Sequence, residues 1–354
     1  MGTPFFVVAP SIGSKPSTGI TVGLASNVAV VNGDPATTRL SVVSGGLKVS
    51  EKGQTLSGLK LSLFFPDDRW SLQGDNRFLW TSQNTYDLGG AATSDPGEDL
   101  KYDQVRVYET IFRTIAPGLF VGAGVDVNRH GSIRAAGGTQ AAFDQAAYTE
   151  YSGLHGFNLA HQTSSGTTVS AMLDTRDNQI NARRGWLVSA TYRTFFNGFM
   201  GGSSSWQEAY VDVRTYRPLT SDGRRRLAVW MLADLVAGGV APYLDLPTTA
   251  GDSYGRSARG YTEGRYRGTH LLYGEVEYRD TLTSNGLLGY VAFLNTTTID
   301  SDAADQHLFD SFAPGAGGGL RVLLNKKSRT NLCVDYGWGK QGSRALYLAI
   351  QEAF

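Results

Sequence analysis

The chain has 354 residues, 44 of them glycine, and its 32 basic residues balance its 32 acidic ones. This balance supplies no long-range positive field of the kind that non-specific nucleic-acid binding needs, so nucleic acid is excluded as a partner. The single cysteine, Cys333, excludes a disulfide framework and any cysteine-rich metal site.

The first residues, MGTPFFVVAP, contain no basic stretch followed by an apolar core, so we expect that a signal peptide is absent from this sequence. The longest apolar run, LAVWMLADLVAGGVAP at 227–242, is interrupted by Asp234 and Gly238. A span of about 20 apolar residues is needed for a transmembrane helix, so insertion through helices is excluded.

Apolar residues recur at every second position in segment after segment, which is the period of a β-strand. In one late segment the opposite face is charged, because Glu275, Glu277 and Arg279 alternate with Val276 and Tyr278. Soluble sandwiches alternate too, so this period alone does not decide the class. The clearest alternating segments are 20–30, 57–65, 69–80, 119–128, 208–214 and 275–279.

The spacing of the connections indicates the architecture. Sixteen strands fit the chain, with short turns after the even-numbered strands and long linkers after several odd-numbered ones. Two unlike rims and an even strand count are typical of outer-membrane barrels, and closure pairs every backbone group in lipid. We therefore predict an all-β, 16-stranded antiparallel transmembrane β-barrel of the outer-membrane type, forming one domain over residues 1–354. The long linkers are 82–99, 130–165, 239–268 and 296–314.

The segment LDTRDNQINARRGW at 173–186 ends one predicted strand and starts the next. Asp174 and Arg176 share the lumen parity, Asp177 follows them, and Gly185 can supply a positive φ where the chain re-enters a strand. The opposite charges can pin the turn to neighbouring strands. The alternative is that this segment is simply a well-made turn.

The final segment, RALYLAIQEAF, places Leu346, Leu348, Ile350 and Phe354 on one face. That face is the lipid face of a last barrel strand, and an aromatic residue at its end resembles the assembly signal of outer-membrane barrels. Glu352 has the same parity and departs from the pattern.

Two motifs resemble the bacterial surface antigen family, which includes barrel-assembly and translocation-assembly proteins and two-partner secretion transporters. The first is Asp-Thr-Arg-Asp-Asn at 174–178 with Gly185, and the second is Arg-Gly-Tyr at 259–261, after the eleventh strand. Gly-Leu-Arg at 319–321 and Val-Asp-Tyr-Gly at 334–337 look like the closing strands of that family. The resemblance covers essentially the whole chain.

The resemblance implies that extracellular loop 6 folds into the barrel and that Arg259, with Gly260 and Tyr261, is held against the lumen wall. Glu277 lies where the family has its acidic partner, and Asn295 stands where a second acid is often found, which either weakens the contact or moves it onto Glu275. A guanidinium in a restricted lumen needs a carboxylate, and a bidentate pair fixes its orientation. The loop's other arginines, Arg256, Arg265 and Arg267, are expected to be loop or rim charges.

The resemblance also implies a bacterial outer-membrane location and a barrel that transports, translocates or inserts protein or lipid. Its lumen would be plugged by a loop, and its seam between the first and last strands would be weak. Pro10 lies on that seam and donates no ladder hydrogen bond, and Phe354 lies at its other strand. The alternative is a passive pore or a structural scaffold.

Members of the family usually carry polypeptide-transport-associated (POTRA) domains before the barrel, whereas the first strand here begins by Phe5, so no periplasmic domain is expected. The expected partners are outer-membrane lipid and lipopolysaccharide, and a separately encoded periplasmic protein is left open. The five histidines lie in or beside long loops and none adjoins a nucleophile motif. We therefore expect neither an enzyme nor a cofactor or metal site.

Overall fold

The computed structural model describes residues 5–91, 99–137, 140–326 and 328–354. Within these ranges the regular structure is mostly β-strand, with two short α-helices and five 3-10 turns. The strands are β1 (Phe5–Lys15), β2 (Gly19–Val31), β3 (Leu40–Ser50), β4 (Thr55–Phe64), β5 (Trp70–Asn84), β6 (Asp99–Ala116), β7 (Leu119–Ala135), β8 (Gln162–Asp174), β9 (Gly185–Phe195), β10 (Trp206–Pro218), β11 (Arg226–Gly239), β12 (His270–Thr281), β13 (Leu288–Ile299), β14 (Ala313–Asn325), β15 (Thr330–Trp338) and β16 (Arg344–Ile350). The helices are α1 (Gln140–Asp144) and α2 (Ala147–Leu154), and the 3-10 turns are η1 (Pro66–Asp68), η2 (Phe199–Gly201), η3 (Tyr243–Asp245), η4 (Asp302–Ala304) and η5 (Lys340–Gly342).

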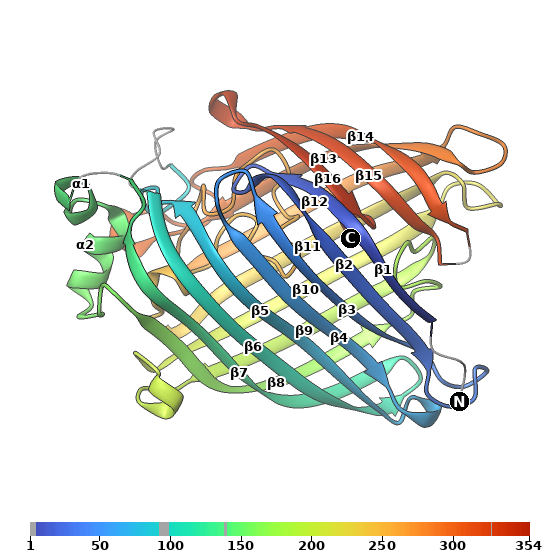
Figure 1. The fold of residues 1–354 in the computed structure, drawn as a ribbon, viewed down its shortest axis with the longest axis horizontal. Coiled ribbons are helices and arrows are strands. Elements are labelled where there is room, and N and C mark those ends of the chain that lie inside the picture. Colours follow the sequence, from blue (N-terminus) through green and yellow to red (C-terminus); the bar gives the residue numbers. More distant parts are fainter. Residues whose placement is uncertain (1–4, 92–98, 138–139, 327) are drawn as a thin grey trace.

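These strands form one closed barrel in which each strand is antiparallel to its neighbours in the chain and β1 meets β16 (Figure 1). The predicted 16-stranded antiparallel barrel is therefore confirmed. Closure matters physically because an open sheet edge leaves a row of backbone N–H and C=O groups without partners.

The barrel wall is apolar on the outside and charged on the inside, the reverse of a soluble protein. On β12, the side chain of Val276 is 45% exposed on the outside, whereas Glu275 and Glu277 are 2% and 0% exposed inside. Buried charges beneath an apolar exterior suit a barrel whose outer face contacts lipid. Further exposed apolar side chains on the strands are Leu24, Leu47, Leu59, Val125, Val169, Met231, Leu294 and Leu320.

The two rims differ in the length of their connections. The short-turn rim has connections such as 117–118, 282–287 and 326–329, whereas the long-loop rim carries 136–161, 240–269 and 300–312. Helices α1 and α2 lie at the long-loop end, and the start of β1 lies towards the other end (Figure 1). No helix in the described ranges is long and apolar enough to cross a membrane.

The seam between the first and last strands is short. Strand β1 pairs with β2 along its whole length, from Phe5 opposite Ala29 to Lys15 opposite Gly19. Its ladder with β16 contains one registered pair, Ser14 opposite Leu348. Most of β1 therefore presents an edge that β16 does not pair.

The end of the chain corrects one expectation from the sequence. Phe354 does not lie on the lipid face, because β16 ends at Ile350 and Gln351 adopts a φ of +79°. Phe354 is only 6% exposed, and its ring packs 5.2 Å from the Trp230 ring inside the barrel. Glu352 gives the physical reason, because a continued strand would place its carboxylate in lipid.

We predict that Val276→Arg lowers the free energy of unfolding by about 2–4 kcal/mol, the cost of an arginine on the lipid face near the middle of a barrel strand. The measurement is urea unfolding of the barrel refolded into lipid vesicles. Val276→Leu is the control and should be close to the unsubstituted chain. An arginine variant as stable as this control would show that the outer face of β12 does not contact lipid.

Candidate functional site

Loop 6, which we define as residues 240–269 between β11 and β12, enters the lumen and contacts the inner wall on several sides. Lys15 on β1 donates to the carbonyl of Tyr254 (2.6 Å), and Lys60 on β4 donates to that of Ser253 (2.6 Å). Arg77 on β5 also donates to the Ser253 carbonyl (2.9 Å). Cations on three separate strands thus hold one short stretch of the loop through its backbone.

Arg259 is only 1% exposed, the lowest exposed fraction among the buried charged residues of loop 6. Its guanidinium contacts both predicted acids on β12, donating from Nε to Oε2 of Glu275 (3.3 Å) and from Nη2 to Glu275 and Glu277. These two glutamates share a face because side chains alternate along a strand. Nη1 donates to Oδ2 of Asp335 on β15 (2.8 Å), so a third carboxylate completes the contact.

Arg259 belongs to a larger group of buried charges, which we call the lumen cluster. Arg279 donates to Glu277 (2.5 Å), and Arg321 contacts Asp335 and Glu352, the latter at 2.6 Å. Each carboxylate therefore has a guanidinium partner, which is the condition for burying such charges without a large penalty. The lumen cluster consists of Arg259, Glu275, Glu277, Arg279, Arg321, Asp335 and Glu352.

Asn295 and Asp335 make contacts with Arg259 that the sequence motifs do not predict. Asn295, on β13, donates its amide to the carbonyl oxygen of Arg259 (3.0 Å) and so binds the loop backbone where an acid would have bound the side chain. The sequence motifs do not point to Asp335 as a partner of Arg259. The alternation of β15 does predict that Asp335 faces inward, on the same side as the buried Cys333.

Gly260 and Tyr261 fix the backbone beside Arg259. Gly260 has a φ of +114°, and a Cβ at this position would lie 2.8 Å from the carbonyl oxygen of Trp338, so only glycine fits without strain. The Tyr261 hydroxyl donates to the carbonyl of Pro314 (2.5 Å) and accepts the N–H of Lys340 (2.8 Å). This pair therefore ties loop 6 to β14 and to the connection before β16.

The other arginines of loop 6 are loop charges with specific partners, and two of them are buried. Arg267 is 2% exposed and donates to the carbonyl of Tyr243 (2.7 Å), and Arg265 is 5% exposed and donates to Gln341 (2.8 Å). Arg256 donates to backbone carbonyls at the end of β16. Their positions depend on the path of the loop inside the barrel, which strand periodicity does not encode.

At the short-turn rim, Asp174 and Arg176 lie together as their shared parity predicts. Arg176 donates from Nε and Nη2 to the two carboxylate oxygens of Asp174 (2.9 and 3.0 Å). Arg39, on the connection between β2 and β3, lies 3.5 Å from the same carboxylate. The pair thus joins this turn to a neighbouring connection.

Asp177 and Gly185 shape the same turn. Burial alone would raise the pKa of Asp177, but the Arg329 guanidinium (2.7 Å) and the N–H groups of Arg183 and Arg184 hold its pKa below the ordinary value. Gly185 has a φ of +106°, and a Cβ there would lie 2.4 Å from the carbonyl oxygen of Thr175. The motif therefore acts on the backbone of the turn.

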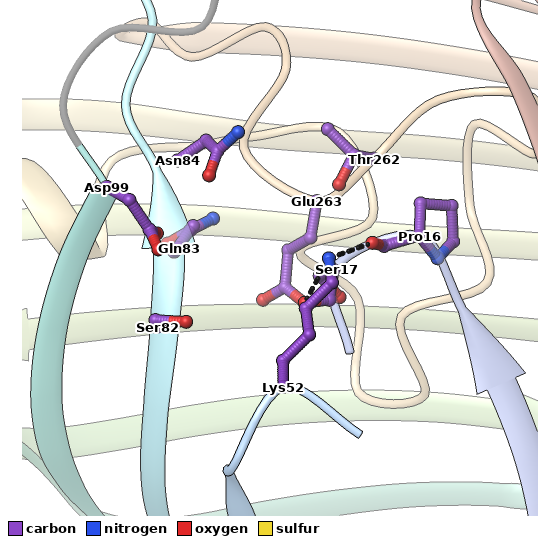
Figure 2. Close-up of a pocket in the computed structure, with 9 residues that line it drawn as sticks. All are labelled: Pro16, Ser17, Lys52, Ser82, Gln83, Asn84, Asp99, Thr262 and Glu263. Carbon is purple, nitrogen blue, oxygen red and sulfur yellow. Dashed lines mark hydrogen bonds between the residues drawn. The ribbon is translucent and has the colours of Figure 1, made fainter. Parts of the chain in front are cut away.

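A small cavity of about 60 Å³ opens at the long-loop end (Figure 2). Its lining is polar, and Lys52 donates there to the carbonyls of Pro16 (2.8 Å) and Ser17 (3.3 Å). The carboxylate of Glu263, from loop 6, lies across from Lys52. No group of three metal-binding side chains was found in the described ranges. The geometry offers ion pairing and steric closure, and the cavity is too small to pass a polypeptide.

We predict that Arg259→Met lowers the free energy of unfolding by about 3–5 kcal/mol, because it leaves neighbouring buried carboxylates without their shared cation. Urea unfolding in lipid vesicles measures this loss. Arg224→Met removes an exposed ion pair with Asp222 and should cost no more than about 1 kcal/mol. Adding Glu277→Gln to Arg259→Met should restore part of the loss, and no restoration would contradict the electrostatic explanation.

No protein-family model and no curated protein matches the sequence. Among solved structures, the chain is similar to BamA from Haemophilus ducreyi lacking POTRA domains 1–3, with 11% identity and a TM-score of 0.63. That alignment covers 98% of this chain and 70% of the BamA chain. CdiB from Acinetobacter baumannii aligns with 13% identity and a TM-score of 0.62, covering 98% of this chain and 59% of CdiB. The resemblance read from the sequence is thus confirmed at the level of the fold: the chain has the 16-stranded outer-membrane barrel fold of BamA and CdiB.

Proposed function

We propose that this chain is an outer-membrane barrel that translocates protein or inserts it into the membrane, through a lumen closed by loop 6 and a seam that opens sideways. The observation that carries the proposal is the combination of a heavily bonded loop inside the lumen with a β1–β16 ladder of one registered pair. The likeness to the BamA and CdiB barrels supports the fold on which this proposal rests. The proposed activity uses no catalytic residue and no cofactor.

The seam is the proposed route between lumen and bilayer. In lipid, a strand edge without partners is costly, because each backbone N–H and C=O group needs a hydrogen bond. The part of β1 that precedes Ser14 has no registered β16 partner, so an incoming strand that pairs there would satisfy these groups. Pro10 lies within this edge and shortens the run of donors.

A passive pore is the alternative, and the arrangement of loop 6 argues against it. An open pore needs a free lumen, whereas Arg259, Gly260 and Tyr261 are tied to β12, β14 and β15. We include outer-membrane lipid and lipopolysaccharide among the proposed partners because the apolar exterior must be solvated by them. A separately encoded periplasmic protein is proposed as a further partner that delivers the substrate.

The lumen half of the proposal predicts that Arg259→Ala changes ion conductance. Planar-bilayer recordings of the refolded chain should show small or flickering currents, and the variant should show large and steady ones because loop 6 loses its anchor. Arg214→Ala is the matched control, since Arg214 pairs with Asp212 on the same strand (2.6 Å) and should leave the currents small. Large steady currents in the unsubstituted chain would favour the passive pore.

The seam half of the proposal predicts that a disulfide across the seam blocks insertion. Ser14→Cys with Leu348→Cys joins the registered pair, in a background where Cys333 is replaced by serine. The assay is the folding rate of an added small unfolded barrel protein into vesicles that contain this chain. The oxidised barrel should lose the acceleration and a reductant should restore it. Equal acceleration before and after oxidation would refute the lateral route.

A further inference from the structure

Residues 351–354, which we call the tail segment, turn into the lumen directly after β16. Glu352 is 4% exposed, and its carboxylate accepts from Arg321 (2.6 Å) and from the Asn331 amide (2.7 Å). The Phe354 ring packs against Trp230 and lies under the Arg279 guanidinium, 5.0 Å away. The tail segment therefore occupies a built site inside the barrel.

The same four residues could instead extend β16 along the seam. Continuing the register of Ser14 opposite Leu348 would place Glu352 opposite Pro10 and Ala353 opposite Ala9. Glu352 would then share the outward parity of Leu346, whose side chain is 48% exposed. A carboxylate on the lipid face is costly, so Glu352 favours the inward position.

Arg256 of loop 6 contacts the backbone where the inward and the extended paths of the tail segment diverge. Its Nη2 donates to the carbonyl of Ile350 (3.1 Å), and its Nη1 donates to the carbonyls of Gln351 (3.2 Å) and Glu352. Carbonyls alternate in direction along a strand, so at least one of these would face β1 if β16 continued. Arg256 thus takes an acceptor that a longer seam would use.

The position of Arg256 is itself set by the fold of loop 6. The carboxylate of Asp252 accepts the N–H groups of Tyr254 (3.0 Å), Arg256 (2.8 Å) and Ser257 (2.7 Å). This turn adjoins Arg259, which is anchored in the lumen cluster. Any displacement of loop 6 therefore also removes Arg256 from the end of β16.

We propose that Arg256 couples loop 6 to the seam. With loop 6 in the lumen, Arg256 keeps the tail segment turned inward and the β1–β16 ladder short, and when loop 6 withdraws, the tail segment is released to pair with β1. The coupling rests on the proposed function, because it regulates the seam proposed there. Such coupling requires an element that can adopt two positions, with an equilibrium that a distant group shifts. The tail segment is that element.

Cysteine cross-linking tests the coupling directly. Ala9→Cys and Ala353→Cys lie opposite each other only if the tail segment extends β16, and Cys333→Ser removes the native thiol. In the refolded barrel the disulfide yield should be low, and Arg256→Ala should raise the extended fraction at least about tenfold, the change expected from losing even one of its charged hydrogen bonds. Arg256→Lys keeps the charge without the fork and should give an intermediate yield.

Two further variants distinguish the coupling from general loosening. Arg267→Ala removes a buried loop 6 arginine that contacts Tyr243, Leu246 and Gln83, and it should leave the yield low. Glu352→Val removes the charge that disfavours the lipid face and should raise the yield with Arg256 in place. The coupling is overturned if Arg256→Ala leaves the yield unchanged or if Arg267→Ala raises it equally. Because cross-linking reports the position of the tail segment alone, a failure of the transport assays would leave this result interpretable.

Discussion

The buried contact between Arg259 and the carboxylates of Glu275, Glu277 and Asp335 is the interaction on which the rest of this structure depends. Two of these acids are neighbours on the inward face of β12, and neither could remain charged there alone. Arg279 on the wall itself pairs with Glu277, but the guanidinium partner of Glu275 comes from loop 6, which supplies Arg259. The electrostatic requirement of one strand therefore determines where a 30-residue loop, 240–269, must go.

The same requirement reaches both rims through the lumen cluster. Arg321 contacts Asp335 on one side and Glu352 on the other, so the charges that hold loop 6 also hold the end of the chain. Arg256 adds a direct contact between these two segments. The loop inside the lumen and the short seam in the wall are consequently parts of one bonded network, although they lie on different elements.

The sequence was sufficient for the fold because the barrel obeys a simple period. Alternation on β12 identified the inward side of Glu275 and Glu277, and the Arg-Gly-Tyr motif located the loop residue that meets them. The two-residue period stops applying where β16 ends, at Ile350. Phe354 was assigned to lipid because the alternation was continued through Glu352, yet a charge at that position makes a turn at Gln351 more favourable than a straight strand.

The partners of the loop arginines could not be read from the sequence for a different reason. Arg256, Arg265 and Arg267 contact residues 94, 76 and 184 positions away, and such pairings depend on the three-dimensional path of an irregular segment. Asp335 is an intermediate case, because its inward parity was visible whereas its distance from Arg259 was not.

Hydrogen exchange of the refolded, unsubstituted chain tests the central claim most directly, because it reports whether loop 6 resides in the lumen. Within loop 6, the N–H of Gly264 donates to Thr249 and that of Gly268 to Pro247, and the N–H of Gly260 donates to the Tyr347 hydroxyl. If the loop is held by the lumen cluster, these amides exchange as slowly as those of β12. Exchange at the rate of an exposed loop would contradict the account.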